Sequence, residues 1–337
     1  MSTWGHAATQ YFYSLTPEVL LSSIEKALKR RSSGRVMQLN SMENRVYEIE
    51  LDDEFGKQNV IAKFYRPGRW SKEQIEEEHI FVKQLAEHEI PTVAALVLNS
   101  GQSIELLAEG GIYFAIFPKM GGRAPDELNE AQAEQVGRLL ARMHNVGASE
   151  KAKYRVKLSP EVFGWSNIEY LKKEKIIPKE FEAVYLNIAE QICRASEELF
   201  KNSEIIRIHG DCHFGNLLTR GEHFFWVDFD DMVMGPPIQD LWLMLPGRDA
   251  EAKYRLSSFL EGYRQMRNFD QASLRLIEPL RALRMINFSA WIARRWEDPA
   301  FKKYFSHFAE PRYWQEQQQA LEEIFEYIKH PQQFWLN

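Results

Sequence analysis

The segment IIRIHGDCHFGNLLTRGEHFFWVDFDD, residues 205–231, places a group of polar side chains between two apolar runs. Its first run is formed by isoleucines at 205, 206 and 208, and its second extends from Phe224 to Val227. Short apolar runs of this kind are typical of buried strands. The chemically versatile side chains of the segment are His209, Asp211, His213, Asn216 and Asp228. We therefore expect most of them on a loop between two strands and Asp228 at the end of the second strand.

Three of these side chains carry oxygen atoms that can converge on one point. Asp211 and Asn216 lie five positions apart on the expected loop, and Asp228 follows the second apolar run. Phosphoryl transfer needs a carboxylate that orients and deprotonates the attacking hydroxyl, together with oxygen ligands for Mg²⁺. Asp211, Asn216 and Asp228 together supply these groups.

A transition-metal site is the alternative interpretation of the same segment. The pattern His209-x-Asp211-x-His213 surrounds Cys212, and imidazole, carboxylate and thiolate are all ligands of Zn²⁺. The sequence of this segment taken alone leaves both interpretations open.

The pattern of apolar residues changes character along the chain. Residues 1–117 predict a small sheet with one or two helices, 118–122 form a glycine-containing connector, and 123–337 are mostly helical. Strands are predicted at 35–39, 45–51, 60–65, 103–107 and 112–117. Helices are predicted from 17 and from 71 onward, and at 129–144, 179–199, 238–245, 251–266, 272–296 and 313–328. We expect the ligand site in a cleft between the two lobes.

Composition narrows the class of protein. The 337 residues carry a net charge of −6, which argues against binding to nucleic acid driven by a basic surface. Two cysteines are too few for a disulfide framework and are typical of a reducing cytoplasm. There is no pattern of a signal peptide and no run of about 18 apolar residues that would span a membrane. We expect a cytoplasmic, monomeric protein with no nucleic-acid or membrane partner.

The motif His209-Gly210-Asp211-x₄-Asn216, followed by Val227-Asp228-Phe229-Asp230, resembles the catalytic loop and metal-binding aspartate of the aminoglycoside phosphotransferase and choline kinase group, relatives of the protein kinases. Further pieces of the chain are similar to bacterial stress-response kinases of that group. They are LNSMENRVYEIE, AKFYRP, EEEH, YFAIFPKMGGR, GPPIQDLWLML and ARRWEDPAF, and they span residues 39–301 in order. The resemblance implies an α+β, two-lobed, protein-kinase-like (aminoglycoside phosphotransferase) fold with a small β-rich N-lobe and a large helical C-lobe.

The resemblance also implies roles for residues of the C-terminal lobe. Asp211 would be the catalytic base, and Asp228 would act with it in catalysis. Asn216 and Asp228 would bind Mg²⁺, and His209 would be a structural member of the loop. Asp240 resembles a carboxylate that braces the catalytic loop through backbone amides.

In the N-terminal lobe, Lys63 lies in Val60-Ile61-Ala62-Lys63-Phe64 and resembles the strand lysine that holds nucleotide phosphates. A glutamate should pair with it. The spacing of apolar residues puts Glu78, rather than Glu76 or Glu77, on the buried face of the following helix. A carboxylate on a buried face requires a cation, so we predict a Lys63–Glu78 pair.

The remaining nucleotide contacts follow from the resemblance. The loop at 39–45, where protein kinases have glycines, contains none, yet the Ser41 hydroxyl and the amides of 41–44 would face the phosphates. Backbone groups near Phe117 and Lys119 would form hydrogen bonds with adenine. Phe117 and Ile61 would be the apolar walls of the adenine site.

The implied activity is an ATP- and Mg²⁺-dependent transfer of phosphate to serine or threonine hydroxyls of proteins, in bacterial stress response. A small alcohol such as choline, homoserine or an aminoglycoside is the alternative acceptor. A nucleotide-binding pseudokinase is disfavoured because Lys63, Asp211, Asn216 and Asp228 are present together. The arginines at 281, 284, 294 and 295 fit either an acidic substrate or a solvated helix face.

Overall fold

The computed structural model describes residues 12, 14–107, 110–245 and 247–330, which form two compact units. The first unit comprises the chain up to Arg123 together with Arg295–Lys303. The second comprises Ala124–Arg294 and the chain from Tyr304 onward. Residues 295–303, which the sequence pattern groups with the helical lobe, thus belong to the first unit. The lobe boundaries at 117 and 123 stay a prediction.

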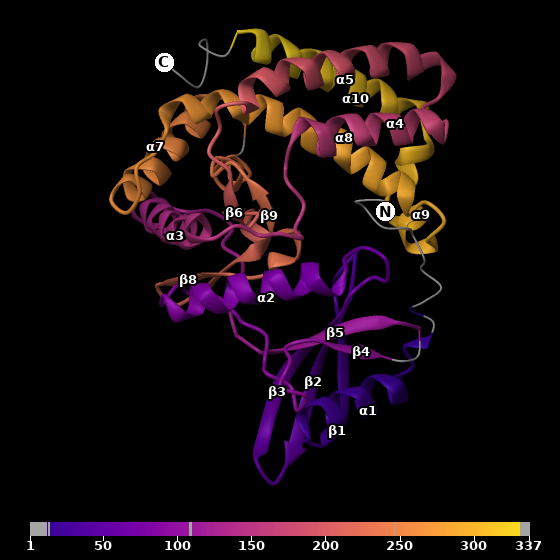
Figure 1. Ribbon diagram of the computed structural model, residues 1–337, viewed down its shortest axis with the longest axis vertical. Helices are drawn as coiled ribbons and strands as arrows, with labels where there is room; N and C mark the ends of the chain where they lie inside the picture. Colours follow the sequence, from indigo (N-terminus) through magenta and orange to yellow (C-terminus); the bar gives the residue numbers. More distant parts are fainter. Residues whose placement is uncertain (1–11, 13, 108–109, 246, 331–337) are drawn as a thin grey trace. The chain divides into compact units, whose positions relative to one another are not determined.

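The first unit is a five-stranded antiparallel sheet with helices on its faces (Figure 1). The strand order is β1-β2-β3-β5-β4. Its elements are α1 (Pro17–Leu28), β1 (Ser32–Leu39), β2 (Arg45–Asp53), β3 (Gly56–Phe64), α2 (Lys72–Glu87), β4 (Glu105–Leu107) and β5 (Ile112–Pro118). All five predicted strands and both predicted helices of this region are therefore present.

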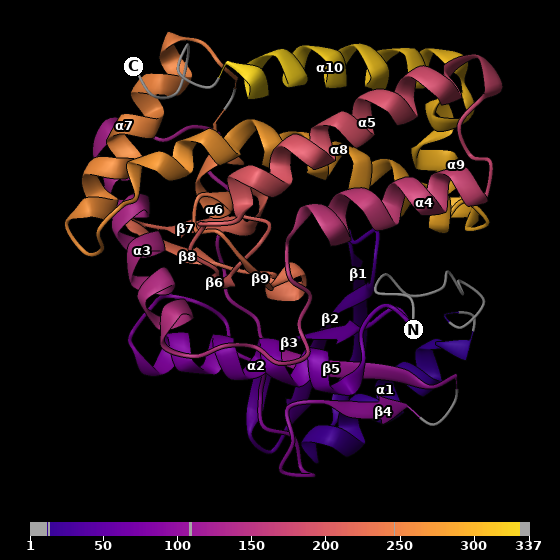
Figure 2. The ribbon, with the colours of Figure 1, turned by 45° about the horizontal axis from the view of Figure 1, so that its top comes forward.

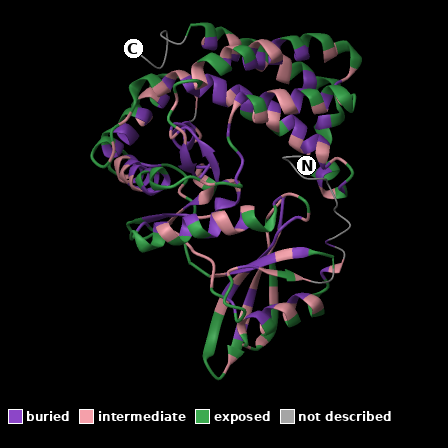
Figure 3. Ribbon diagram, viewed as in Figure 1, coloured by how far each residue is buried: buried purple, intermediate pink, exposed green. Residues whose placement is uncertain are grey.

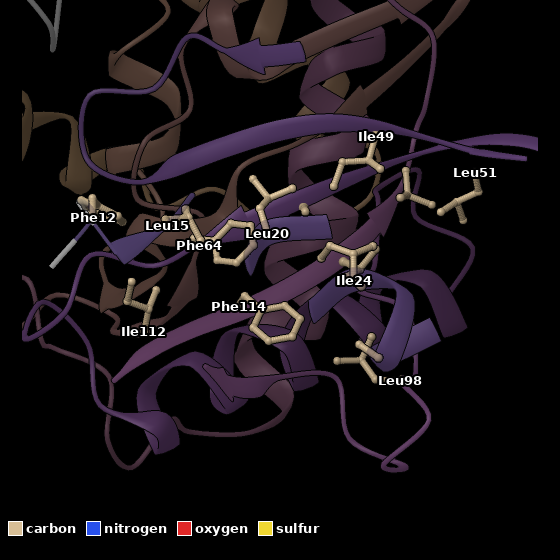
Figure 4. Close-up of a cluster of buried hydrophobic side chains, with 14 residues drawn as sticks. Phe12, Leu15, Leu20, Ile24, Ile49, Leu51, Phe64, Leu98, Ile112 and Phe114 are labelled. Carbon is tan, nitrogen blue, oxygen red and sulfur yellow. The ribbon is translucent and has the colours of Figure 1, made fainter. Parts of the chain in front are cut away.

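One face of this sheet packs against α1. The helix begins where Thr16 accepts a hydrogen bond from the amide of Val19, with Pro17 at its first position. Its buried side chains Leu20 and Ile24 join alternate residues of β3 and β5 in one apolar cluster (Figure 4). Because side chains alternate along a strand, the intervening residues of β3 point to the opposite face.

The opposite face of the sheet packs against α2. Ser71 and Gln74 form a capping box that starts this helix. His79 reaches from the helix to the Tyr65 hydroxyl at 3.0 Å, and its ring contacts Phe117 at a centroid distance of 5.9 Å. Phe117 is the register partner of Ile61 in β3, so α2 covers the face to which Ile61 and Lys63 point.

The second unit is mostly helical, with two small two-stranded sheets. Its elements are α3 (Glu130–Ser149), the π-helical turn η2 (Pro160–Trp165), α4 (Ser166–Lys173), α5 (Lys179–Phe200), β6 (Ile206–Ile208), η3 (Phe214–Asn216), β7 (Leu217–Arg220), β8 (His223–Trp226), η4 (Phe229–Asp231), β9 (Val233–Gly235), α6 (Gln239–Trp242), α7 (Ala250–Arg264), η5 (Gln271–Leu276), α8 (Ile277–Arg294), η6 (Ser306–Ala309) and α10 (Pro311–Lys329). Helix α9 (Pro299–Tyr304) begins in the first unit. Figure 2 shows α5, α8 and α10 side by side, and the outer face of α10 is exposed (Figure 3). Among the described residues, none of the helices has the length and apolar character needed to cross a membrane.

The helix predicted at 272–296 is wrong at both ends. Its first turns are the 3₁₀ segment η5, and α8 begins only at Ile277. Pro279 explains this, because a proline lacks the amide hydrogen that a helix interior needs and is tolerated only in the first turn. At the other end, α8 stops at Arg294, where the chain enters the first unit.

Glycines allow α3 and α7 to pack closely. A Cβ atom at Gly137 would lie 2.0 Å from the carbonyl oxygen of Phe259, and one at Gly262 would lie 1.9 Å from the carbonyl oxygen of Glu134. Both obstacles are backbone atoms of the other helix. A side chain at either position would therefore push the helices apart.

We predict that Gly262→Ala destabilises the protein. Helix propensity favours alanine by about 1 kcal/mol, but overpacking of a buried contact costs about 1–3 kcal/mol and the backbone oxygen cannot move aside. Urea unfolding should show a lower free energy of unfolding for the variant. Gly121→Ala is the matched control, because a Cβ there meets no atom within 4 Å. Equal stability of the two variants would contradict the close packing.

A surface ion pair links the end of α1 to the β2–β3 hairpin. The Arg30 guanidinium contacts both carboxylate oxygens of Asp53, at 3.0 and 2.9 Å. Asp53 also accepts hydrogen bonds from the amides of Arg31 and Phe55. The hydrogen bond from Arg30, with these amides, lowers the pKa of Asp53 to about 2.

We predict a pH-dependent effect of Asp53→Asn. A carboxylate whose pKa is lowered by folding stabilises the folded state above its unfolded pKa, near 3.9, and loses that contribution as the pH falls toward its folded pKa. The variant should be less stable than the wild type at pH 7, and the difference should shrink at pH 3. Urea unfolding at both pH values measures this, and a difference independent of pH would contradict the assignment.

Candidate active site

The polar segment around Asp211 connects β6 to β7, and Asp228 lies just beyond β8. Val227 joins the two parts through both of its backbone groups. Its amide donates to the carbonyl of Asn216 at 3.0 Å, and its carbonyl lies 3.0 Å from Nε2 of His209. His209 Nδ1 accepts a hydrogen bond from the amide of Asp211, so Nε2 carries the proton and donates to Val227. The expected structural role of His209 is thus visible in its contacts.

Asp240 holds the start of the loop. Its two carboxylate oxygens accept hydrogen bonds from the backbone amides of His209 and Gly210, each at 2.8 Å. The same carboxylate contacts Nε2 of His144 at 3.2 Å, and both side chains are fully buried. The resemblance to a bracing carboxylate is confirmed by these contacts.

Gly210 has a backbone conformation and an environment that exclude a side chain. Its φ angle is +87°, which favours glycine, and a Cβ atom would lie 2.3 Å from the carbonyl oxygen of Asp231. The close approach brings the loop that carries Asp211 against the segment that follows Asp228. Only glycine fits between the two.

Asp211 is held as a carboxylate by two neighbours. Arg284 of α8 contacts its Oδ1 at 2.8 Å, and Nε2 of His213 lies 3.3 Å from its Oδ2. Burial alone would raise the pKa of Asp211, but the hydrogen bond from His213 and the charge of Arg284 outweigh it and hold the pKa well below its usual range. Asp211 is therefore ionised at neutral pH, as a proton acceptor must be.

Asn216 and Asp228 present oxygen atoms suited to Mg²⁺. The side-chain amide of Asn216 donates to the carbonyl of Asp211 at 3.0 Å, which leaves its Oδ1 on the opposite side of the amide group. Asp228 is exposed and has a φ of 61°, a left-handed conformation that aspartate tolerates. The bond from Val227 to Asn216 keeps the two residues near each other. An amide and a carboxylate oxygen fit a hard cation.

The transition-metal alternative does not fit this geometry. Both ring nitrogens of His209 are engaged in hydrogen bonds, and burial together with the neighbouring carboxylates raises the pKa of the Cys212 thiol well above its usual value. Across the described ranges, the only group of three or more histidine, cysteine or acidic ligands that could share an ion is Glu130, Glu134 and Glu261 on α3 and α7. The segment around Asp211 is not among such groups.

In the first unit, Lys63 is the last residue but one of β3, paired in register with Val46 and Ala115. Its side chain is 7% exposed, and its ammonium group lies 5.3 Å from the centre of the Tyr65 ring. Glu78 is 2% exposed on α2, so the prediction that it lies on the buried face is confirmed. The ion pair between Lys63 and Glu78 stays a prediction.

The loop before β2 is held by its own side chains and by Arg66. Ser41 Oγ accepts a hydrogen bond from the amide of Asn44 at 3.3 Å, and Asn44 Oδ1 accepts from the amide of Arg66 at 3.1 Å. The Asn44 amide is thus occupied by Ser41 within the loop. A phosphate contact of Ser41 stays a prediction.

The connector after β5 continues the pairing of the sheet. The amide of Lys119 donates weakly to the carbonyl of Asn59 at 3.4 Å, and its ammonium group binds the carboxylate of Glu48. Phe117 lies beside Ile61 in register and against His79. The two proposed apolar walls are therefore neighbours, whereas adenine contacts of Phe117 and Lys119 stay a prediction.

The sequence pattern does not distinguish Arg284 from its neighbours, although the structure does. Arg281 lies over the Trp242 ring, and Arg294 lies over the Tyr170 ring. Arg295 is buried against Glu43 in the first unit. Arg284 alone among these four arginines is exposed and contacts Asp211. The sequence shows that Arg284 lies beside apolar residues of a helix. It does not show the contact with Asp211, which is 73 positions away.

Comparison with known proteins agrees with this geometry. The model of the phosphotransferase enzyme family matches residues 35–277. Stress response kinase A of Salmonella paratyphi A is 39% identical over 307 residues, covering 91% of each chain. The protein of the same name from Escherichia coli K12 is 37% identical over 321 residues, covering 95% of each chain.

Solved structures show the same fold. Amicoumacin kinase hAmiN, in complex with AMP-PNP, Ca²⁺ and Ami, has a TM-score of 0.71 at 21% identity and covers 89% of this chain and 94% of its own. A microcompartment-associated aminopropanol kinase has a TM-score of 0.68 at 18% identity and covers 94% and 98%. The α+β, protein-kinase-like fold predicted from the sequence is confirmed. The chain therefore belongs to the phosphotransferase enzyme family and is a kinase.

Proposed function

We propose that this kinase transfers the γ-phosphoryl group of ATP, with Mg²⁺, to serine or threonine hydroxyls of proteins as part of a stress response. The observation that carries the transfer chemistry is the ionised Asp211. It lies on the same loop as Asn216 and contacts Arg284 of α8. Family membership supports the same chemistry.

In the second unit, Asp211 orients the acceptor hydroxyl and takes its proton. Asn216 and Asp228 hold the cation, which when bound neutralises charge on the nucleotide phosphates. Asp240 keeps the loop in place through the amides of His209 and Gly210. The pKa of Asp211 is low enough that the base is ready at any neutral pH.

In the first unit, Lys63 binds phosphate oxygens and Glu78 holds the lysine. Ser41 and its loop contribute further phosphate contacts. Backbone groups near Phe117 and Lys119 bind adenine beside Ile61. The burial of Lys63 and Glu78 supports this assignment, because buried charges in a sheet and an adjacent helix are rarely retained without a partner or a ligand.

The names of the relatives support a protein acceptor. The relative from Salmonella typhimurium is named serine/threonine protein kinase RdoA and is 39% identical over 91% of both chains. The cytoplasmic location and the monomeric state expected from the sequence stay predictions.

A small alcohol is the second candidate acceptor. The solved structures of similar fold include the aminopropanol kinase and a spectinomycin phosphotransferase, with a TM-score of 0.64 for the latter. Their identities of 18% and 16% support the shared fold alone, so the acceptor has to be decided by experiment.

We predict that Asp211→Asn reduces phosphate transfer by about 10²–10⁴-fold, because the amide cannot accept the proton. ATP binding should be retained. Asp228→Asn should lower both transfer and Mg²⁺-dependent ATP binding, because a cation ligand is lost. The two variants are distinguished by their transfer rates and by calorimetric measurement of ATP binding with and without Mg²⁺. Asp126→Asn, an exposed aspartate outside these contacts, is the matched control.

Unchanged turnover of Asp211→Asn would refute the site. A pseudokinase would be indicated by a wild type that binds ATP and transfers no phosphate to any acceptor.

The acceptor class is tested with labelled ATP. We predict that the wild type labels serine or threonine in generic basic and acidic proteins, and that the label is absent with Asp211→Asn. A parallel panel contains choline, homoserine and aminoglycosides. Label on a small alcohol alone would establish the second candidate and overturn the proposed protein acceptor.

A further inference from the structure

Five charged side chains meet in the interior of the first unit, and we name them the arginine–carboxylate cluster. They come from three separate stretches: the loop before β2, the chain just after β3, and residues 295–303, which we name the strap. The members are Glu43, Arg66, Arg69, Arg295 and Asp298. Arg66, Arg295 and Asp298 are at most 4% exposed, and Glu43 is 8% exposed.

Arg66 joins the strap to the loop. Its Nε lies 3.1 Å from Oε1 of Glu43, and its NH2 group lies 3.2 Å from Oδ2 of Asp298. The guanidinium also donates to the backbone carbonyls of Glu43 and Met42, at 3.0 and 3.4 Å. One side chain thus contacts two loop carbonyls, a loop carboxylate and a strap carboxylate.

Arg295 gives the strap a direct contact with the loop. Its Nε and NH2 groups lie 3.1 and 2.8 Å from Oε1 of Glu43. Arg69 adds a third cation, 3.9 Å from the other oxygen of Glu43. The cluster therefore contains three cations and two carboxylates.

Aromatic rings enclose Arg66 and anchor the strap. The guanidinium lies 5.5 Å from the ring centre of Phe12 and 5.7 Å from that of Phe301, which belongs to the strap and is fully buried. Asp298 also caps the following helical turn by accepting a hydrogen bond from the amide of Ala300. The strap is thereby fixed at several points inside the unit.

The carbonyls that Arg66 binds determine the direction of the loop amides. In a trans peptide the C=O and N–H groups point in opposite directions. Because the carbonyls of Met42 and Glu43 point toward Arg66, the amides of Glu43 and Asn44 point away from it, and the Asn44 amide donates to Ser41 Oγ within the loop. Such a loop can present the Glu43 amide in a fixed direction without the glycines that protein kinases use.

Favourable packing alone does not explain why these five charged side chains are buried. Desolvating several charges costs more than burying apolar groups of similar size, and replacing a buried ion pair by apolar residues is often neutral or stabilising. A network of this kind is better explained by the fixed geometry that it imposes on the loop.

We propose that the arginine–carboxylate cluster is a positioning device, in which the strap orders the loop at 41–44 and thereby sets the affinity for nucleotide phosphates. This inference rests on the proposed function, because it takes the loop as the phosphate-binding segment. Asp298 and Arg295 are positioning residues that act through Arg66 and Glu43.

The test compares two ligands that differ in their phosphates. Asp298→Asn keeps the shape of the side chain and its cap on Ala300, and removes the charge that holds Arg66. Calorimetry should show ATP–Mg²⁺ binding weakened by about tenfold, the change that loss of one ordering hydrogen bond corresponds to. Adenosine, which carries no phosphate, should bind with unchanged affinity. The KM for ATP should rise, with the KM for the acceptor unchanged.

Asp52→Asn is the matched control, because Asp52 lies in the same sheet and forms an exposed ion pair with Lys57. Equal weakening of ATP and adenosine, or no change in either, would overturn the inference. If Asp298→Asn does not fold, Arg295→Lys is tested in the same way, by comparing the loss of ATP affinity with the loss of adenosine affinity. This variant keeps the positive charge and loses one contact with Glu43. A wild type that does not bind ATP would refute the proposed function itself, whereas ATP binding without the selective loss refutes only the role of the cluster.

Discussion

The geometry of the loop that carries Asp211 depends on one buried carboxylate, that of Asp240. A fully buried carboxylate is costly unless hydrogen bonds replace its water, and here two backbone amides and an imidazole do so. Its contacts fix His209 and Gly210, and His209 in turn holds the carbonyl of Val227. The backbone positions of Asp211 and Asp228 therefore both depend on the contacts of Asp240.

The side chain of Asp211 is set by a different part of the chain. Arg284 approaches from α8 and His213 from the loop itself, and their combined effect exceeds the influence of burial on the pKa of Asp211. The backbone position of Asp211 and the protonation state of its side chain thus depend on different parts of the chain. The contacts of Asp240 fix the backbone beside Asp211, and the hydrogen bond from His213 together with the charge of Arg284 keeps its carboxylate ionised.

Many of the helices and strands can be predicted from signals within a few residues, whereas the long-range contacts cannot. Caps such as Thr16 and Ser71 and the alternation of the sheet strands predict their elements because the signals lie within a few residues. Strands β7 and β9 have three or four residues and show too little periodicity to be detected. The spacing of Asp211, Asn216 and Asp228 is a local motif, whereas Arg284 reaches Asp211 across 73 positions. Contacts of that kind depend on tertiary packing, which a residue pattern does not specify.

The arginines at 281, 284, 294 and 295 show that basic residues close together in the sequence can have unrelated contacts in the structure. From the sequence they fit either an acidic substrate or a solvated helix face, yet Arg281 and Arg294 lie over aromatic rings, Arg284 contacts Asp211, and Arg295 is buried in the other unit. Arg281 and Arg284 lie about one turn apart on α8, so their spacing alone would give them similar surroundings, and the elements packed around the helix decide which of the two stays exposed.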